Sequence, residues 1–421
     1  MSVMTIAASS DPAGKLAESM ARTLFWLSIG VFFIGGFLSA SVSLLVPQLK
    51  AILGLDYKGA FLIQLAFHFS YLLFALPAAL AVVRVGYMRA IAIGLAVMAA
   101  GCLGLATAQG LRVFVLLLGA LLLLSAGQTV LQIASNTVVT VIGPARGAAF
   151  RLTLLQGYNS LGTVMGPLLS APFLLSRVMP GAHRDITPSL PFAAAGFILT
   201  ILALLYVGHR SLLVGSAVGA RDYLPRDWPQ LFLGVLRERR LRWGSVAIFV
   251  YVGAEVTIGT LMTNMLMLPE RLGLDPVSAG RLVSLYWAGA MVGRFVGAWL
   301  MTWISEAGLL ACAAAMAVAL TMGAALLPGA LGAAALIAVG LCNAIMYPTI
   351  YALALPRDRQ LAPLASMWLC MAVVGGAVVP MLTGVVADRV GLLPALLLPA
   401  ICYVGIGGFA IACGWSREKD A

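Results

Sequence analysis

Long apolar stretches alternate with short polar connections along the whole chain. They are predicted to be helices at residues 23–50, 59–83, 89–109, 113–142, 150–176, 191–208, 243–267, 282–304, 307–328, 330–356, 362–387 and 392–414. Most exceed the roughly 20 apolar residues that a helix needs to cross a bilayer core of about 30 Å. A run such as residues 113–125 does not alternate between apolar and polar positions, as the strands of a membrane barrel would. The pattern therefore predicts an all-α membrane protein with 12 transmembrane helices.

The composition agrees with a membrane protein. Hydrophobic residues make up 62% of the chain and charged residues 10%, whereas soluble domains have about 45–50% and about 25%. The first apolar run begins only after Arg22 and continues far beyond the length of a signal-peptide core. We therefore expect it to be a retained helix and not a cleaved leader.

Lys and Arg are distributed unevenly among the connections. With the N-terminus placed in the cytoplasm, the connections on that side carry 17 of the 26 basic residues and those on the opposite side carry 8, while Arg294 lies within a span. Basic residues favour the cytoplasmic face, so we expect both termini in the cytoplasm and the protein in a bacterial-type inner membrane. The net charge of +11 then reflects topology. No basic patch with interleaved aromatics is present, which argues against nucleic-acid binding.

The sequence offers no catalytic or metal-binding motif. All six cysteines lie in apolar runs without CxxC or His/Cys spacing, and of the three histidines only His68 lies within a span. Neither a metal site nor a cofactor is expected. The connections also lack GxSxG, HExxH, P-loop and paired-carboxylate patterns. We therefore expect neither an enzyme nor an ATP-driven pump.

The longest polar segment divides the chain into two halves of six helices. We predict an N-terminal bundle at residues 1–208, a cytoplasmic linker at 209–242 and a C-terminal bundle at 243–421, with a short surface helix at 237–240. Similar polar positions occur late in the fourth and tenth helices, where Asn136 and Asn343 lie. Such repeats suit transport by alternating access, in which two halves rock about a site near the membrane midplane.

Glu255 is the only one of the 15 acidic residues that lies in the middle of a span. Burying an acid there costs about 2.5–3.5 kcal/mol on insertion scales, and intramembrane acids mark functional sites by default. We expect Glu255 to bind the substrate or to titrate as a coupling residue. The alternative is a structural ion pair or hydrogen bond between helices, with Arg294 as a candidate partner.

Amide side chains form a stripe on the fourth helix. Gln128, Gln132 and Asn136 are spaced four residues apart and point the same way. Amides both donate and accept hydrogen bonds, which suits a polyol that exchanges water for protein partners. The alternative is hydrogen bonding between helices, and Gln128 is the weaker substrate candidate. The same reasoning extends to amides of other spans, namely Gln156, Asn159, Asn264 and Asn343.

Several motifs together resemble a known family of transporters. They lie at residues 59–80 (GAFLIQLAFHFSYLLFALPAAL), 132–136, 150–152, 156–162, 251–259, 284–295, 343–350 and 370–377. Over nearly its whole length the chain resembles the fucose/glucose/galactose sugar-transporter branch of the major facilitator superfamily, and its second half is most similar to the glucose/galactose members. The resemblance implies two six-helix bundles with a monosaccharide as substrate.

Four aromatic residues fall within these motifs, namely Tyr251, Tyr286, Trp287 and Tyr347. Aromatic rings supply apolar platforms for the C–H faces of a sugar ring, so the resemblance adds these four to the candidate site. The alternative is interfacial anchoring or core packing.

The chain lacks two intramembrane acids that occur in that branch. Members commonly carry an acid in the first helix, shortly before a proline, and fucose members carry a Glu in the fourth helix; both acids are associated with proton coupling. Here Ser43 and Gln132 occupy these positions. Gln132 agrees with the glucose/galactose members, whereas the loss of the first-helix acid is an exception, and neither side chain titrates. Coupling to a proton or to sodium therefore stays open beside facilitated diffusion.

A further departure concerns the loop between the second and third helices. In the superfamily this loop tends to carry an Asp-Arg-x-Gly motif that locks the inner gate. Here residues 83–86 read VRVG, without the Asp, whereas DRVG occurs at residues 388–391, on the opposite side of the membrane in the predicted topology. The resemblance thus implies a weaker inner lock.

The residues and the resemblance together predict a monomeric transporter of a hexose, embedded in a lipid bilayer. The alternative is an exporter of apolar drug-like or lipid compounds, whose cavity would be rich in methionine and poor in amides. The 18 methionines of the chain keep that alternative open.

Overall fold

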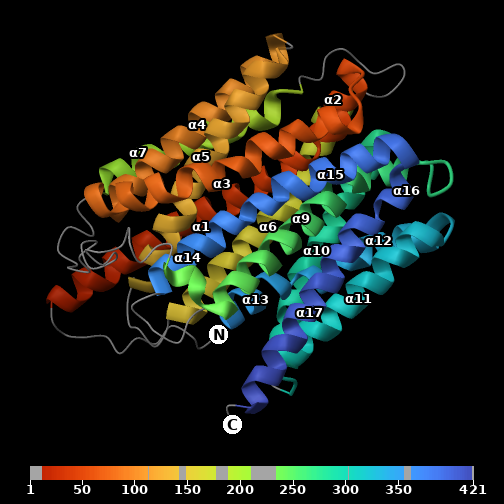
Figure 1. The fold of residues 1–421 in the computed structure, drawn as a ribbon. Helices are drawn as coiled ribbons and strands as arrows, with labels where there is room; N and C mark the ends of the chain where they lie inside the picture. Colours follow the sequence, from red (N-terminus) through yellow and green to blue (C-terminus); the bar gives the residue numbers. More distant parts are fainter. Residues whose placement is uncertain are drawn as a thin grey trace.

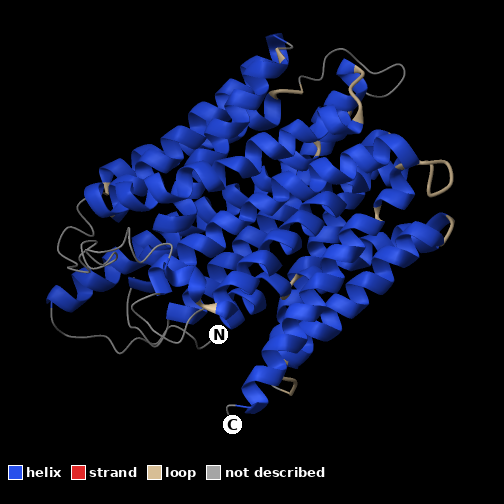
Figure 2. Ribbon diagram, in the orientation of Figure 1, coloured by secondary structure: helices blue, strands red, loops and turns tan. Residues whose placement is uncertain are grey.

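The computed structural model describes residues 12–111, 113–141, 148–176, 188–209, 234–301, 303–354 and 362–419, and these residues are almost entirely helical (Figures 1 and 2). The first half contains α1 (Pro12–Ser43), α2 (Leu45–Leu53), α3 (Tyr57–Val85), α4 (Tyr87–Leu111), α5 (Phe114–Val141), α6 (Ala148–Leu174) and α7 (Leu190–Gly208). The second half contains α9 (Arg239–Met267), α10 (Pro276–Leu300), α11 (Glu306–Leu326), α12 (Gly329–Asn343), α13 (Met346–Ala354), α14 (Ala362–Met371), α15 (Gly375–Val390), α16 (Leu392–Ala395) and α17 (Leu397–Lys419).

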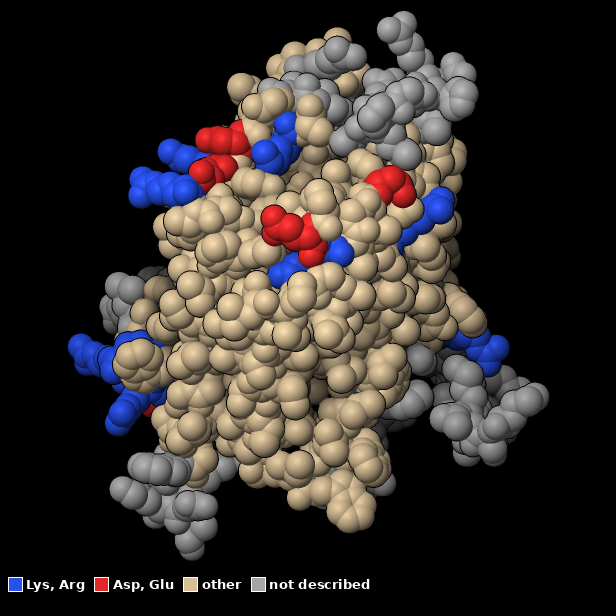
Figure 3. Space-filling view, turned by 90° about the vertical axis from the view of Figure 1, so that its right-hand side faces the viewer, with Lys and Arg blue, Asp and Glu red and all other residues tan. Residues whose placement is uncertain are grey.

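These helices form 12 membrane spans. Within the described residues, 10 helical stretches are long and apolar enough to cross a membrane. The other two spans are α6, with 27 residues, and α10, with 25, each about 40 Å long at 1.5 Å per residue. A broad face of the surface carries no charged side chain and is bordered by Lys, Arg, Asp and Glu (Figure 3). The chain is therefore a multi-pass membrane protein, and the predicted fold class is confirmed.

Three spans are broken just before a proline. The interruptions lie at Leu44 before Pro47, at residues 344–345 before Pro348, and at Leu396 before Pro399. A proline ring clashes with the carbonyl four residues upstream and donates no hydrogen bond to it. The spans predicted at 23–50, 330–356 and 392–414 are present as spans, but each is interrupted by one or two non-helical residues, which the apolar pattern did not predict.

Two further differences concern helix continuity. The span predicted at 362–387 consists of α14 and α15 joined by a short 3-10 turn, η6 (Ala372–Val374). The basic run at 237–240 forms no separate surface helix: a 3-10 turn, η5 (Val235–Arg237), leads into α9, which begins at Arg239. The span simply extends into the basic run, because no proline or glycine stops it there. Residues 210–233 of the predicted linker lie outside the described residues, so its bounds stay a prediction.

The two halves meet mainly along two pairs of helices. Within the first half α4 packs on α5 and α7, and α1 packs on α6; within the second half α11 packs on α17, and α10 packs on α12. Between the halves, α6 packs against α10 and α3 against α15, and the latter pair runs side by side in Figure 1. We call the end of the bundle where α1 begins and α17 ends the termini end, and the opposite end the distal end.

Glycines allow the closest of these helix contacts. A Cβ atom at Gly36 of α1 would collide with the backbone of Asn159 in α6. In α10, a GxxxG series places Gly293 against the Leu341 carbonyl and Gly297 against Ile345. Small residues at such positions let membrane helices approach to backbone contact, which fixes α10 beside the end of α12, where the polar residues of the site lie.

Candidate functional site

A network of hydrogen bonds joins four polar side chains of the second half. The Tyr251 hydroxyl donates to Oε1 of Glu255 at 2.7 Å and lies 3.1 Å from the backbone carbonyl of Asn343. Nδ2 of Asn343 donates to the Tyr286 hydroxyl at 2.7 Å, and this hydroxyl faces the Glu255 carbonyl at 3.3 Å. Three spans, α9, α10 and α12, are therefore joined at one place inside the membrane.

Local helix geometry explains how these groups meet. Tyr251 and Glu255 are four residues apart on α9 and share one face of it. Asn343 is the last residue of α12, just before the break caused by Pro348. The last carbonyls of a helix have no partner within it, and the carbonyl of Asn343 accepts the Tyr251 hydroxyl instead. The helix break thus supplies an acceptor to the network.

Among the described residues of α9, α10 and α12, three buried amide or indole atoms have no hydrogen-bond partner. They are Oδ1 of Asn343, Nε1 of Trp287 and Nδ2 of Asn264. Because Nδ2 of Asn343 is occupied by Tyr286, the free Oδ1 can only accept, whereas the other two atoms can only donate. A buried polar group without a partner costs about 1–3 kcal/mol. The arrangement therefore suits a ligand that both donates and accepts hydrogen bonds.

Aromatic rings border the same polar atoms. Trp287 packs edge-on against Tyr286, with ring centroids 5.0 Å apart. Tyr347 of α13 lies 6.3 Å from Tyr251 and stacks on Tyr351 at 6.1 Å. The four aromatic candidates are thus brought together with Glu255 and Asn343, and the second-half candidates form one cluster of polar atoms and ring faces.

This cluster lies next to the first half. Arg294 of α10 donates to the Ser160 hydroxyl of α6 and is close enough to Glu255 to act on it electrostatically. Nε2 of Gln64 in α3 donates to Thr260 of α9 at 3.1 Å. The direct hydrogen bond of Arg294 therefore goes across to the first half, and that of the Glu255 carboxylate goes to Tyr251.

The candidate amides of the first half differ in whether they bond to another helix. Gln132 of α5 and Gln156 of α6 are partly buried. Nδ2 of Asn159 donates to the Phe32 carbonyl of α1 at 2.9 Å, and Nε2 of Gln128 donates to Ser39 at 2.7 Å. In this structure Asn159 and Gln128 therefore link helices. The side chain of the remaining candidate, Asn136, lies outside the described residues.

Sequence reasoning missed three polar residues at the boundary of the halves, namely Gln64, Ser160 and Thr260. Gln64 lies within the motif at 59–80, but Ser and Thr are common in membrane helices and bond to their own backbone, as Thr257 does with the Gly253 carbonyl at 2.7 Å. Spacing alone therefore gives no signal for them.

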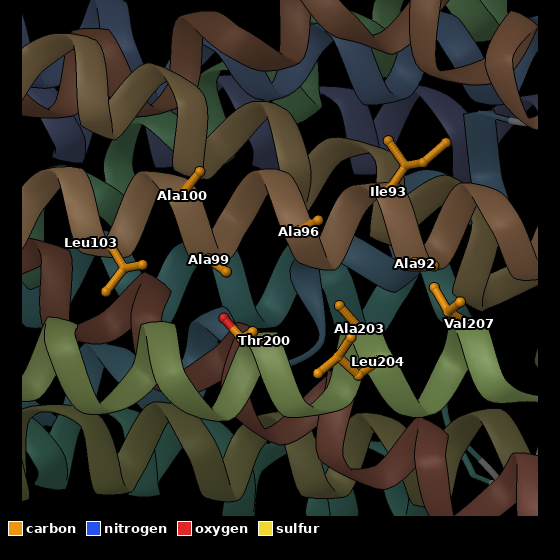
Figure 4. A pocket seen from close by; sticks show the side chains of 10 residues that line it. All are labelled: Ala92, Ile93, Ala96, Ala99, Ala100, Leu103, Thr200, Ala203, Leu204 and Val207. Carbon is orange, nitrogen blue, oxygen red and sulfur yellow. The ribbon is translucent and has the colours of Figure 1, made fainter.

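An apolar groove of about 500 Å³ lies between α4 and α7, away from this cluster (Figure 4). Alanines and leucines line most of it, and its one hydroxyl, that of Thr200, donates to the Gly196 carbonyl at 2.8 Å. The groove offers no free polar atom to a hydrophilic ligand. The polar cluster of α9, α10 and α12 is therefore the candidate site.

Comparisons with known proteins agree with this architecture. The family model of the Major Facilitator Superfamily matches residues 25–357. A glucose/galactose transporter of Brucella abortus is 38% identical over 90% of this chain and 92% of its own length. The L-fucose-proton symporter of Escherichia coli is 29% identical over 92% of both chains. The crystal structure of a variant of the E. coli fucose:proton symporter, FucP, superposes with a TM-score of 0.66, at 27% identity over 92% of this chain and 98% of that one.

Proposed function

The chain belongs to the major facilitator superfamily, in its fucose/glucose/galactose branch, and from this premise we propose that it carries a hexose of the glucose/galactose type across the membrane by alternating access. Like its relatives, which are transporters, it is a transporter and not an enzyme. The names of those relatives also favour a sugar over the apolar cargo of a drug or lipid exporter.

The observation that carries the proposal is the set of partnerless polar atoms in the second half. A sugar hydroxyl donates to Oδ1 of Asn343, and other hydroxyls accept from Nε1 of Trp287 and Nδ2 of Asn264. The rings of Tyr286, Trp287 and Tyr347 offer apolar faces to the C–H bonds of the sugar. Each such hydrogen bond replaces one that the sugar makes with water, which is the condition for a polyol to leave solvent.

The proposed site also includes residues of the first half, since alternating access places the substrate between the halves. Of the first-half candidates whose side chains are described, Gln132 and Gln156 are those without a helix-to-helix bond given above. The full set of proposed binding residues is Gln132, Asn136, Gln156, Asn159, Tyr251, Glu255, Asn264, Tyr286, Trp287, Asn343 and Tyr347.

Glu255 is the proposed coupling residue. It is the one acid in the middle of a span, and only one of its two carboxylate oxygens is engaged by Tyr251. Ser43 and Gln132 cannot substitute for it, because neither side chain releases a proton. Proton coupling through Glu255 is therefore the mode of transport that we put to the test.

Uptake into proteoliposomes tests the proposal. Radiolabelled glucose, galactose and fucose are offered without a gradient, with an inward proton gradient and with a sodium gradient. Accumulation above equilibrium under the proton gradient alone is expected. Saturable equilibration that ignores both gradients would identify a uniporter. An absence of flux for all three sugars would refute hexose transport.

Glu255→Gln separates coupling from binding. Gln keeps the size of the side chain and an acceptor for Tyr251, but it does not titrate and so cannot take up or release a proton. We expect the variant to lose accumulation under a proton gradient while it still exchanges labelled for unlabelled sugar. Glu270→Gln, an exposed acid in the distal loop, is the control. Accumulation by Glu255→Gln equal to that of the parent would exclude Glu255 as the carrier.

A further inference from the structure

The distal ends of the two halves are joined by a carboxylate. Asp388, in the last turn of α15, accepts a hydrogen bond from the backbone N–H of Tyr57 at 2.8 Å through Oδ1. Its Oδ2 accepts from the backbone N–H of Lys58 at 2.9 Å. The two donors are the first residues of α3, so one side chain of the second half binds the beginning of a helix of the first half.

The first turn of α3 is suited to this contact. The first four N–H groups of a helix have no partner within it, and the helix dipole is positive at that end. Asp56, the N-cap residue of α3, accepts from the Gly59 N–H at 2.7 Å. Asp388 accepts from the N–H groups of the two preceding residues, Tyr57 and Lys58. Three consecutive amides are thus bound by two carboxylates, one from each half.

Packing continues the same seam toward the middle of the membrane. One turn from Asp388, Gly384 lies so close to α3 that a Cβ atom there would come within 2.5 Å of the Phe61 ring. Further along, Gly376 lies against the ring of His68 at a distance that leaves no room for a Cβ atom. Since α3 and α15 run antiparallel, Asp388 is the distal end of one continuous contact between the halves.

The two helices of this seam end in the same kind of turn. Gly86 ends α3 with φ of 82° and ψ of 160°, and Gly391 ends α15 with φ of 93° and ψ of 166°. The preceding residues are VRV in the first case and DRV in the second. The two turns differ in one respect that matters here: the carboxylate exists only at the distal end.

We propose that Asp388 is a latch that holds the distal end of the transporter closed. When the halves separate at that end, the Tyr57 and Lys58 amides and the Asp388 carboxylate return to water, so the contact exists only in the distal-closed state and biases the equilibrium toward it. The proposal rests on alternating access and does not depend on which sugar is carried.

The size of the effect follows from the exposure of the contact. Asp388 and Lys58 are exposed, Lys50 lies over the ring of Tyr57 at 4.2 Å, and Arg389 follows directly on α15. Carboxylates at exposed helix N-termini contribute modestly. Removing the charge is therefore expected to raise the ratio of distal-open to distal-closed molecules about two- to fivefold.

Distances between spin labels test the latch. Labels are placed at Ala51→Cys and Glu270→Cys, two exposed distal positions in different halves, in a chain whose six native cysteines are replaced. The labelled protein is reconstituted in lipid without sugar, so failure of hexose transport and failure of the latch remain distinguishable. Asp388→Asn is expected to increase the longer-distance population about two- to fivefold.

Two variants keep the test decisive. Gly384→Ala leaves Asp388 in place but forces α15 away from Phe61, and it is expected to shift the distances the same way. Asp275→Asn changes a distal carboxylate that caps its own helix, α10. This control is expected to leave the distances between the spin labels unchanged. Distances in Asp388→Asn identical to the parent would overturn the proposal. So would an equal shift in Asp275→Asn, because general loosening of the distal end would then explain it.

Discussion

Two adjacent side chains of α10 use their polar atoms in opposite ways. The Tyr286 hydroxyl connects Asn343 with Glu255, whereas Nε1 of Trp287 is buried without a partner. A hydroxyl within a network contributes to folding, and a partnerless donor does not. At the scale of single residues, the pair therefore separates groups that hold the structure from groups available to a ligand.

We expect Trp287→Phe to change the free energy of unfolding by less than about 0.5 kcal/mol on account of hydrogen bonding, because no protein hydrogen bond is lost. Hexose binding should weaken by about five- to tenfold, since a buried ligand hydroxyl loses its donor. Tyr286→Phe should instead destabilise the protein by about 1–3 kcal/mol. Calorimetric titration and thermal melting in detergent measure both quantities. Equal destabilisation by the two substitutions would contradict the assignment.

The sequence predicts which residue types form the candidate site better than it predicts their hydrogen-bond partners. Glu255 and Asn343 are conspicuous because acids and amides are rare in spans. Their partners were not predictable, because spacing along a helix gives a face and not the neighbour opposite that face. Gln128 and Gln132 share one stripe of α5, yet the bond from Gln128 to Ser39 depends on where α1 lies.

At the scale of a helix, Asp275 caps the N-terminus of α10 outside the membrane. Its Oδ1 accepts from the N–H groups of Val277 and Ser278, both at 3.0 Å. Hydrogen bonds from the side chain and backbone of Ser278 hold the pKa of Asp275 below its ordinary value. A carboxyl with a lowered pKa in the folded state stabilises the protein above its unfolded pKa, and the contribution is lost as the pH falls through the folded pKa.

Melting of the parent and of Asp275→Asn should therefore differ most between about pH 5 and pH 7, with the parent more stable, and should converge below about pH 3.9, the ordinary pKa of Asp. The difference should stay under about 1 kcal/mol, because the carboxyl is largely solvated and Asn still caps the helix. A difference that grew on acidification would mean that the carboxylate opposes folding.

The helices themselves were largely predictable, and their interruptions were not. Twenty-residue apolar runs define spans because the hydrocarbon core demands them. A proline, however, leaves α3 unbroken at Pro77 and interrupts the tenth span before Pro348. At the break before Pro348, the hydroxyl of Tyr251 on the neighbouring helix α9 bonds the freed carbonyl of Asn343. That information belongs to the packing and is absent from the local sequence.

For the whole molecule, the distribution of Lys and Arg predicts which end faces the cytoplasm. Green fluorescent protein fused after Lys419 should fluoresce, and alkaline phosphatase fused there should be inactive, because cytoplasmic basic residues retain that end inside. Fusions at Leu272, in the distal loop between α9 and α10, should give the reverse. Active phosphatase at Lys419 would invert the orientation and place the Asp388 latch on the cytoplasmic side.

The arginines of α10 have a consequence for how the chain is made. α10 carries Arg281 and Arg294 and is not among the 10 helices that are apolar enough to span by composition alone. An arginine within a lone membrane helix raises its insertion free energy, by about 2.5–3.5 kcal/mol when it lies at the centre. Because Arg294 donates to Ser160 of α6, a helix synthesised more than a hundred residues earlier provides its polar partner. The eighth span is therefore synthesised after the helix that supplies its polar partner. The order of synthesis from N- to C-terminus thus contributes to the insertion of this protein into the bilayer.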